Sequence, residues 1–173
     1  MKKRKFLSVI TLLIGASLLS AKPYMEKTPQ MAQKVKEIAG EQSPYYRGKK
    51  EQFPHDYFLV NKNLPFLVGA ILFHPQGDKL KLTKEQLEKF KEMKKTLVPQ
   101  SMKIAKEVKE MELKLAKEIL EEKKDPKELY PLVDEIAKKK AALTKAHLDC
   151  IHKVQSILTP QQYKTLLQLV SKK

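Results

Sequence analysis

The chain has 173 residues, which is the length of one domain, and its abundance of Lys, Glu, Leu and Ala favours helices over sheet. Its formal net charge is +15, and its 42% of hydrophobic residues is ordinary for a soluble helical protein. A single cysteine excludes an intramolecular disulfide.

Residues 1–21 have the order of regions of a secretory signal. A positive region comes first, then an apolar stretch over 6–19, and then the small residues Ser20 and Ala21. The stretch is short for a membrane span, which needs about 20 apolar residues. The sequence therefore predicts export to the periplasm and no membrane span after cleavage. An uncleaved N-terminal anchor is the alternative, because Leu19 is large for its place before the cut.

Export changes what the positive charge implies. Removal of residues 1–21 takes away four positive groups, which are Lys2, Lys3, Arg4 and Lys5, and leaves a net charge of +11. A cytosolic protein of this charge would suggest a nucleic-acid partner first. For an exported chain we expect no nucleic acid, and negatively charged unfolded chains, acidic polymers or anionic lipid become the candidate partners.

The part of the mature chain before residue 80 has two stretches of different character. Residues 22–63 lack a sustained period and are predicted to form an irregular N-terminal arm, with one short helix at about 29–39. The stretch 64–75 is apolar on all sides, with Pro65 near the first turn of a predicted helix. We expect it to be buried against the rest of the domain; a sticky exposed face is the alternative.

Residues 80–173 have strong helical periodicity. The sequence predicts helices over 83–97, 99–124, 127 or 131 to 157, and 160–171. One apolar stripe comprises Ile104, Val108, Met111, Leu115 and Ile119. The other comprises Val133, Ile136, Leu143, His147, Cys150, Val154 and Ile157. The predicted fold is all-α, a long antiparallel hairpin with shorter flanking helices over 64–173. One hairpin cannot cover both its faces, which predicts a homodimer.

A capping motif occurs twice. Leu82-Thr83-x-x-Gln86 opens the first of these helices, and Leu158-Thr159-x-x-Gln162 opens the last. In a capping box the Thr hydroxyl accepts from the backbone N–H three residues on, while the Gln side chain accepts from the Thr N–H. The preceding Leu can pack against the residue five positions later. Loss of either Thr is expected to cost about 1 kcal/mol.

The pair of Leu-Thr-x-x-Gln motifs in a secreted, basic, helical chain resembles the Spy/CpxP family of periplasmic chaperones and stress adaptors, which includes metal-responsive relatives. The resemblance covers about residues 64–171. It implies a cradle-shaped homodimer whose basic, partly apolar concave face holds unfolding proteins without ATP. The partners implied are unfolded or misfolded envelope proteins or the periplasmic domain of a sensor kinase.

Methionines on the charged helices are candidates for contact with such clients, because Met side chains adapt to varied apolar surfaces. They are Met93, Met102 and Met111, and ordinary core filling is the alternative role for them.

His147 and Cys150 are three residues apart and share a helix face, so they are candidate ligands for a divalent metal. This supports the alternative function of a periplasmic heavy-metal sensor or buffer with the same fold. Two ligands do not complete a zinc site, and both residues fall on the apolar stripe, so a place in the core is the competing interpretation. No catalytic motif is present in the sequence, which predicts that the protein is not an enzyme.

Overall fold

The computed structural model describes residues 23–25, 28–30, 33, 55–60 and 63–171. Within these ranges the elements are all helical: η1 (His55–Tyr57), α2 (Leu67–Phe73), η2 (Gly77–Leu80), α3 (Lys84–Leu120), α4 (Pro126–Ile157) and α5 (Pro160–Val170). The all-α fold with a long hairpin is confirmed. The predicted signal segment 1–21 and most of the predicted helix 29–39 lie outside the described residues.

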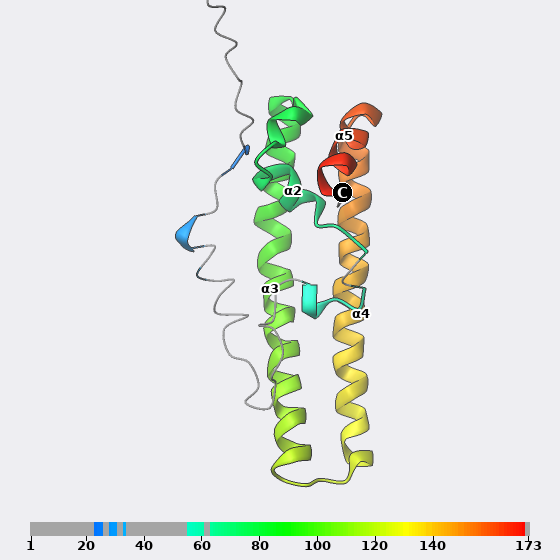
Figure 1. The fold of residues 1–173 in the computed structure, drawn as a ribbon. Helices are drawn as coiled ribbons and strands as arrows, with labels where there is room; N and C mark the ends of the chain where they lie inside the picture. The colour runs from blue at the N-terminus through cyan, green and yellow to red at the C-terminus, as the bar shows by residue number, and fades with distance from the viewer. Residues whose placement is uncertain (1–22, 26–27, 31–32, 34–54, 61–62, 172–173) are drawn as a thin grey trace, which may run out of the picture.

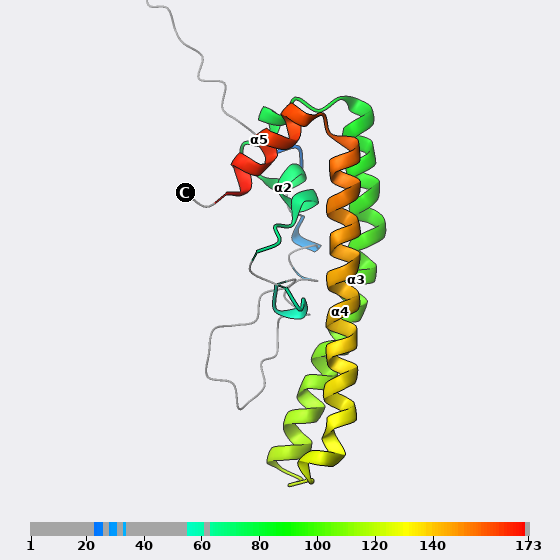
Figure 2. The ribbon, with the colours of Figure 1, turned by 90° about the vertical axis from the view of Figure 1, so that its right-hand side faces the viewer.

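The hairpin consists of α3 and α4, which lie side by side along their length (Figure 1). The shorter elements η1, α2 and α5 all lie on one side of the hairpin (Figure 2). We call this side the inner face. The end of the hairpin where α3 begins and α4 ends is called the open end, and the opposite end, where the chain passes from α3 to α4, is the turn end.

The prediction of two helices separated at Pro99 is wrong. A single α3 runs from Lys84 to Leu120 with Pro99 inside it. A proline removes one backbone hydrogen bond and crowds the carbonyl four residues earlier, but tertiary packing on both sides can keep a helix continuous. Phe90 before Pro99 and Ala105 after it are fully buried against other elements. Figure 2 shows that α3 is bent, which is the usual consequence of an interior proline.

The connection between the long helices also differs from the prediction. Helix α3 ends at Leu120 and not at 124, and Lys123 in the turn has a left-handed φ of 54°. Pro126 begins α4 and does not stop the preceding helix. Its missing N–H costs nothing at the first helical position, and the Asp125 carboxylate accepts from the Lys127 N–H at 2.8 Å.

Two clusters of buried side chains form the core. The end cluster joins α2, α5 and the open end of the hairpin through Leu67, Ile71, Leu72, Leu80, Phe90, Val154, Leu158 and Leu166. The middle cluster joins η1 to the centre of the hairpin through Tyr57, Phe58, Ala105, Val108, Ile136 and Leu143. The apolar stretch predicted at 64–75 is thus anchored in the end cluster, with its helix starting at Leu67, two residues after Pro65.

The apolar stripes of the two long helices are not buried along their whole length. Their central residues Val108, Ile136 and Leu143 belong to the middle cluster. Ile119 and Val133, nearer the turn end, are 36% and 45% exposed. The shorter elements lie over the open end and the middle of the hairpin. They do not reach the turn end, so the apolar side chains of Ile119 and Val133 stay partly exposed there.

Candidate functional site

Both predicted capping boxes are formed. The Thr83 hydroxyl accepts from the Gln86 N–H at 3.2 Å, and the Gln86 Oε1 accepts from the Thr83 N–H at 3.0 Å. At the second motif the same two bonds join Thr159 and Gln162, with the same distances of 3.2 and 3.0 Å. Both helix starts therefore satisfy backbone N–H groups that would otherwise lack an intrahelical partner.

The two motifs also bind each other, which the sequence did not predict. The Gln86 Nε2 donates to the Gln162 Oε1 at 2.9 Å, and the Gln162 Nε2 donates back to the Gln86 Oε1 at 3.1 Å. Each amide also reaches a backbone carbonyl beside the opposite motif. Gln86 donates to the Ile157 carbonyl at 2.9 Å and Gln162 to the Lys81 carbonyl at 3.3 Å. We call this pseudo-symmetrical network the glutamine clasp.

Hairpin geometry explains why the motifs meet. Helices of 37 and 32 residues run antiparallel, so the residue after α4 returns to the level of the residue before α3. The leucines of both motifs then face the same interior: Leu158 is buried in the end cluster and Leu82 packs against it. The predicted packing partners Leu87 and Tyr163 lie against that cluster too. The signal available in the sequence was the similar length of the two helical segments between the motifs.

A segment that follows the predicted signal cleavage site also contacts this end of the hairpin. The Tyr24 hydroxyl accepts from the Leu82 N–H at 3.0 Å, and the Met25 N–H donates to the Leu72 carbonyl at 2.7 Å. Both side chains pack against the end cluster. This part of the arm predicted as irregular is therefore tied to α2 and to the first motif.

His147 lies in the core, and its neighbours in the structure are aromatic. It is 7% exposed, and its ring centroid is 4.5 Å from that of Phe66 and 5.4 Å from that of Phe58. Phe58 and Phe66 contact each other edge to face at 5.3 Å. Neither phenylalanine was predicted from the sequence to be a site residue. Phe58 belongs to the middle cluster and Phe66 packs against it, so His147 is placed beside that cluster.

Cys150 is half-buried one turn further along α4. Burial raises the pKa of its thiol, and the positive charge of Lys153 opposes this only in part. A thiol with a raised pKa is mostly protonated at neutral pH, and the thiolate is the form that binds a metal ion. Among the residues that the structure describes, no group of three or more His, Cys, Asp and Glu side chains is placed to hold a metal ion. Metal binding by His147 and Cys150 stays a prediction.

The three candidate methionines are half-buried. Met93 packs against the end cluster and Met111 against the middle cluster. The side chains of Met93 and Met111 thus border the interior and keep part of their surface toward solvent. This placement agrees with core filling and leaves an apolar edge for contact with another protein.

Charged side chains on the hairpin form several ion pairs. Two of them cross between the long helices: Lys139 to Glu107 at 2.8 Å and Lys140 to Glu112 at 2.5 Å. The hydrogen bond from Lys139 is the main reason why the pKa of Glu107 lies below its usual value. These pairs join α3 to α4 but are partly exposed, so each contributes little to stability.

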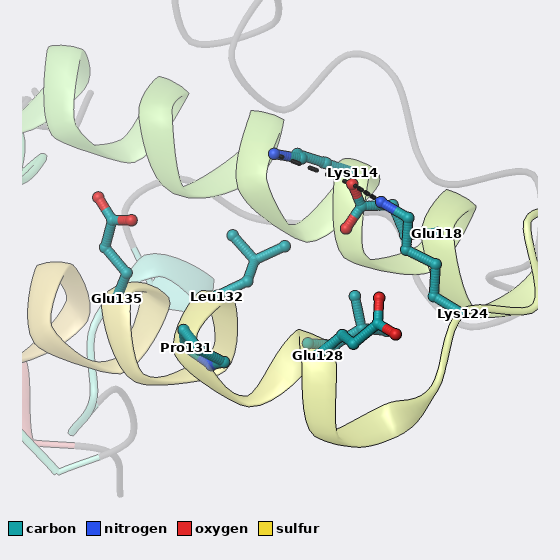
Figure 3. Close-up of a pocket in the computed structure, with 8 residues that line it drawn as sticks. Lys114, Glu118, Lys124, Glu128, Pro131, Leu132 and Glu135 are labelled. Atoms are coloured by element: carbon teal, nitrogen blue, oxygen red, sulfur yellow. Dashed lines mark hydrogen bonds and ion pairs between the residues drawn. The ribbon is translucent and has the colours of Figure 1, made fainter.

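An open hollow of about 350 Å³ lies near the turn end, where α4 begins. Figure 3 shows Lys114 and Lys124 reaching toward the carboxylate of Glu118, while Leu132 points into the space between the helices. The Lys124 Nζ lies 2.9 Å from Glu118. The charges nearest the hollow thus already pair with each other, and its lining has the chemistry of a surface ion-pair network.

Larger apolar side chains are exposed near the same end. Leu120 is 52% exposed and Tyr130 is 58% exposed, and the half-covered Ile119 and Val133 lie close to them in sequence. Both glutamates and lysines lie near these side chains in the sequence.

No helix within the described residues is both long and apolar enough to cross a membrane. No family model, curated protein or solved structure matches the chain.

Proposed function

We propose that this chain is an exported, ATP-independent chaperone or stress-response adaptor. It binds unfolded or partner proteins on the basic, partly apolar surface of its hairpin, and it acts as a homodimer in the periplasm.

The observation that carries the proposal is the glutamine clasp. The two Leu-Thr-x-x-Gln motifs, which gave the resemblance to the Spy/CpxP family, meet in one hydrogen-bond network at the open end of the hairpin. A repeated motif whose two copies depend on each other is a stronger basis for the resemblance than two separate helix caps.

The surface chemistry supports the same function. A net charge of +11 after signal removal attracts negatively charged chains over long range. Exposed and half-buried apolar side chains on α3 and α4 then offer contacts that need no fixed partner geometry. Weak, adaptable contact combined with electrostatic attraction is what a holdase requires.

The test is an aggregation assay on residues 22–173 with a chemically denatured client diluted into buffer. We expect suppression of light scattering at near-stoichiometric amounts without ATP. A basic helical protein of the same size serves as the control for charge alone. No suppression over a tenfold range of concentration contradicts the chaperone function. The same assay with a chelator tests the metal-dependent alternative.

An adaptor and a chaperone differ in the number of proteins that they bind. A pulldown from periplasmic extract at low and high salt should retain many proteins if the chain is a chaperone. One abundant partner that is lost as salt rises would instead identify an adaptor.

A further inference from the structure

The middle of the inner face is covered by a very short segment, residues 55–60. Its one regular element is the three-residue turn η1 (His55–Tyr57), which lies over the centre of the hairpin (Figure 2). Tyr57 and Phe58 are 1% and 6% exposed, whereas the next two residues, Leu59 and Val60, are 61% and 43% exposed. Two adjacent aromatic side chains therefore make the apolar contact of this segment.

The surface beneath these rings belongs to the hairpin. Ala105 and Val108 of α3 and Ile136 and Leu143 of α4 form it, with Ile104, Met111, Leu115 and Leu132 at its edge. Without Tyr57 and Phe58, both long helices would present an apolar groove. No residue of that groove needs an aromatic partner from this chain in particular, because apolar burial is not directional.

One polar contact of the segment is equally general. The Leu59 N–H donates to the Thr144 Oγ1 at 2.9 Å. A backbone N–H is available from any residue except proline, so Thr144 recognises the path of a backbone and not a side chain. The Phe58 ring adds an edge contact with His147.

The rest of the inner face is held differently. Helix α5 follows α4 directly and is tied to α3 by the glutamine clasp, and α2 is part of the end cluster. Segment 55–60 has no helix of comparable length. None of its residues belongs to the end cluster or to the clasp, and its link to α2 is the contact between Phe58 and Phe66.

We propose that segment 55–60 is an intramolecular plug, and that the groove beneath it binds an extended stretch of unfolded protein with two adjacent aromatic residues. This rests on the proposed chaperone function and names its site and ligand class. Client and plug compete for the same groove, so the apparent affinity for client is reduced by the fraction of molecules with an open groove.

The test uses a fluorescent peptide with the sequence of residues 55–60, added to the full mature chain. The double variant Tyr57→Ala/Phe58→Ala empties the groove, and we expect it to bind the peptide at least about tenfold more tightly than the wild type. A peptide with serine in place of both aromatic residues should not bind. The matched control is Leu59→Ala/Val60→Ala, which alters the exposed side chains and should behave as the wild type.

Equal peptide affinity of the folded double variant and the wild type would overturn the plug. Far-UV circular dichroism checks the fold of the variant. If it does not fold, Thr144→Val replaces it, since this change removes only the hydroxyl of a side chain on α4. We then expect faster hydrogen exchange at the Leu59 amide and tighter peptide binding, and unchanged values of both would reject the proposal.

An aggregation assay on the same variants tests the plug and the chaperone function separately. If the wild type suppresses aggregation and the variant with the open groove does so no better, the chaperone function stands and the plug fails. If the peptide binds the open groove but no variant suppresses aggregation, the groove stands and the chaperone function fails.

Discussion

Gln86 and Gln162 each use all the hydrogen-bonding capacity of one side-chain amide. Each Oε1 accepts from its own threonine and from the other glutamine, and each Nε2 donates to the other glutamine and to a backbone carbonyl. No other side chain of similar length offers both a double donor and a double acceptor. Glu could cap its own helix but could not donate across to the other motif.

Removal of one glutamine is therefore predicted to affect both helix starts. Gln86→Ala and Gln162→Ala should each lower the free energy of unfolding by about 1–3 kcal/mol, because the remaining amide loses its partners. In a double-mutant cycle the two changes should be non-additive, with a coupling energy of about 0.5–3 kcal/mol. Urea unfolding followed by circular dichroism measures all four proteins.

Gln161 provides the matched control, since its side chain is exposed and next to Gln162. Gln161→Ala should change the unfolding midpoint only slightly. If the changes at Gln86 and Gln162 simply add, the clasp does not couple the two motifs in solution.

Cys150 gives a prediction about alkaline pH. Burial raises the pKa of its thiol in the folded state. The unfolded thiol, with a pKa of about 8.5, releases its proton first. Above that pKa the unfolded state binds fewer protons than the folded state. The contribution of Cys150 to the free energy of unfolding is therefore fully present below that pKa and is lost as the pH rises through the folded-state pKa.

We therefore expect the free energy of unfolding to fall as the pH rises above about 8.5, with the fall smaller in Cys150→Ala. Folded protein should also react with iodoacetamide more slowly than urea-unfolded protein at pH 8. Equal alkylation rates would show that the thiol is accessible and ionises as in an unfolded chain.

The two capping boxes could be predicted from sequence because a cap is local: Thr83 and Gln86 are three residues apart, and the bonds between them follow from that spacing. The clasp could not, because Gln86 and Gln162 meet only when two long helices of similar length fold back together. The position of His147 on an apolar helix face could likewise be predicted from the local spacing of residues. Its contacts with Phe58 and Phe66 could not, because these two residues come from another part of the chain.

At the scale of elements, α3 contains the largest difference between sequence and structure. A proline normally ends a helix, yet Pro99 lies inside α3 because packing on either side outweighs the loss of one hydrogen bond. Local propensity predicted the break, and the buried Phe90 and Ala105, which only the tertiary structure places, explain why it does not occur.

Pro99→Ala is predicted to raise the free energy of unfolding by about 1–3 kcal/mol, because it restores a backbone N–H and removes the clash of the ring. Urea unfolding measures the change. Pro126→Ala is the control: Pro126 occupies the first helical position of α4, where proline is tolerated, so its replacement should have little effect. Destabilisation by Pro99→Ala would mean that the bend itself is needed for packing against the inner face.

Segment 55–60 illustrates a second limit of sequence patterns. A helix of three residues has no period to detect, and its burial depends on a groove formed by residues some 50 to 90 positions later. The adjacent aromatic residues Tyr57 and Phe58 were the available signal, but they could equally belong to a surface loop until the hairpin is placed beneath them.

At the scale of the whole molecule, the cover of the hairpin is unequal. The open end has α2, α5 and the clasp, and the middle has η1. The turn end exposes apolar side chains on both helices, most of all Leu120 and Tyr130. Ile119 and Val133, at the turn end of the two predicted stripes, are partly exposed as well. We expect a partner to cover this apolar surface.

We predict that this partner is a second copy, so light scattering after size exclusion should give twice the mass of the mature chain at micromolar concentration. Leu120→Lys/Tyr130→Lys should shift the mass toward the monomer, because charge placed in an apolar interface is costly to desolvate. Leu167→Lys is the control, since Leu167 is also exposed, at 39%, but lies on α5 at the open end. A wild-type monomer at tens of micromolar would contradict the dimer, and a dimer that survives the double change would place its interface away from the turn end.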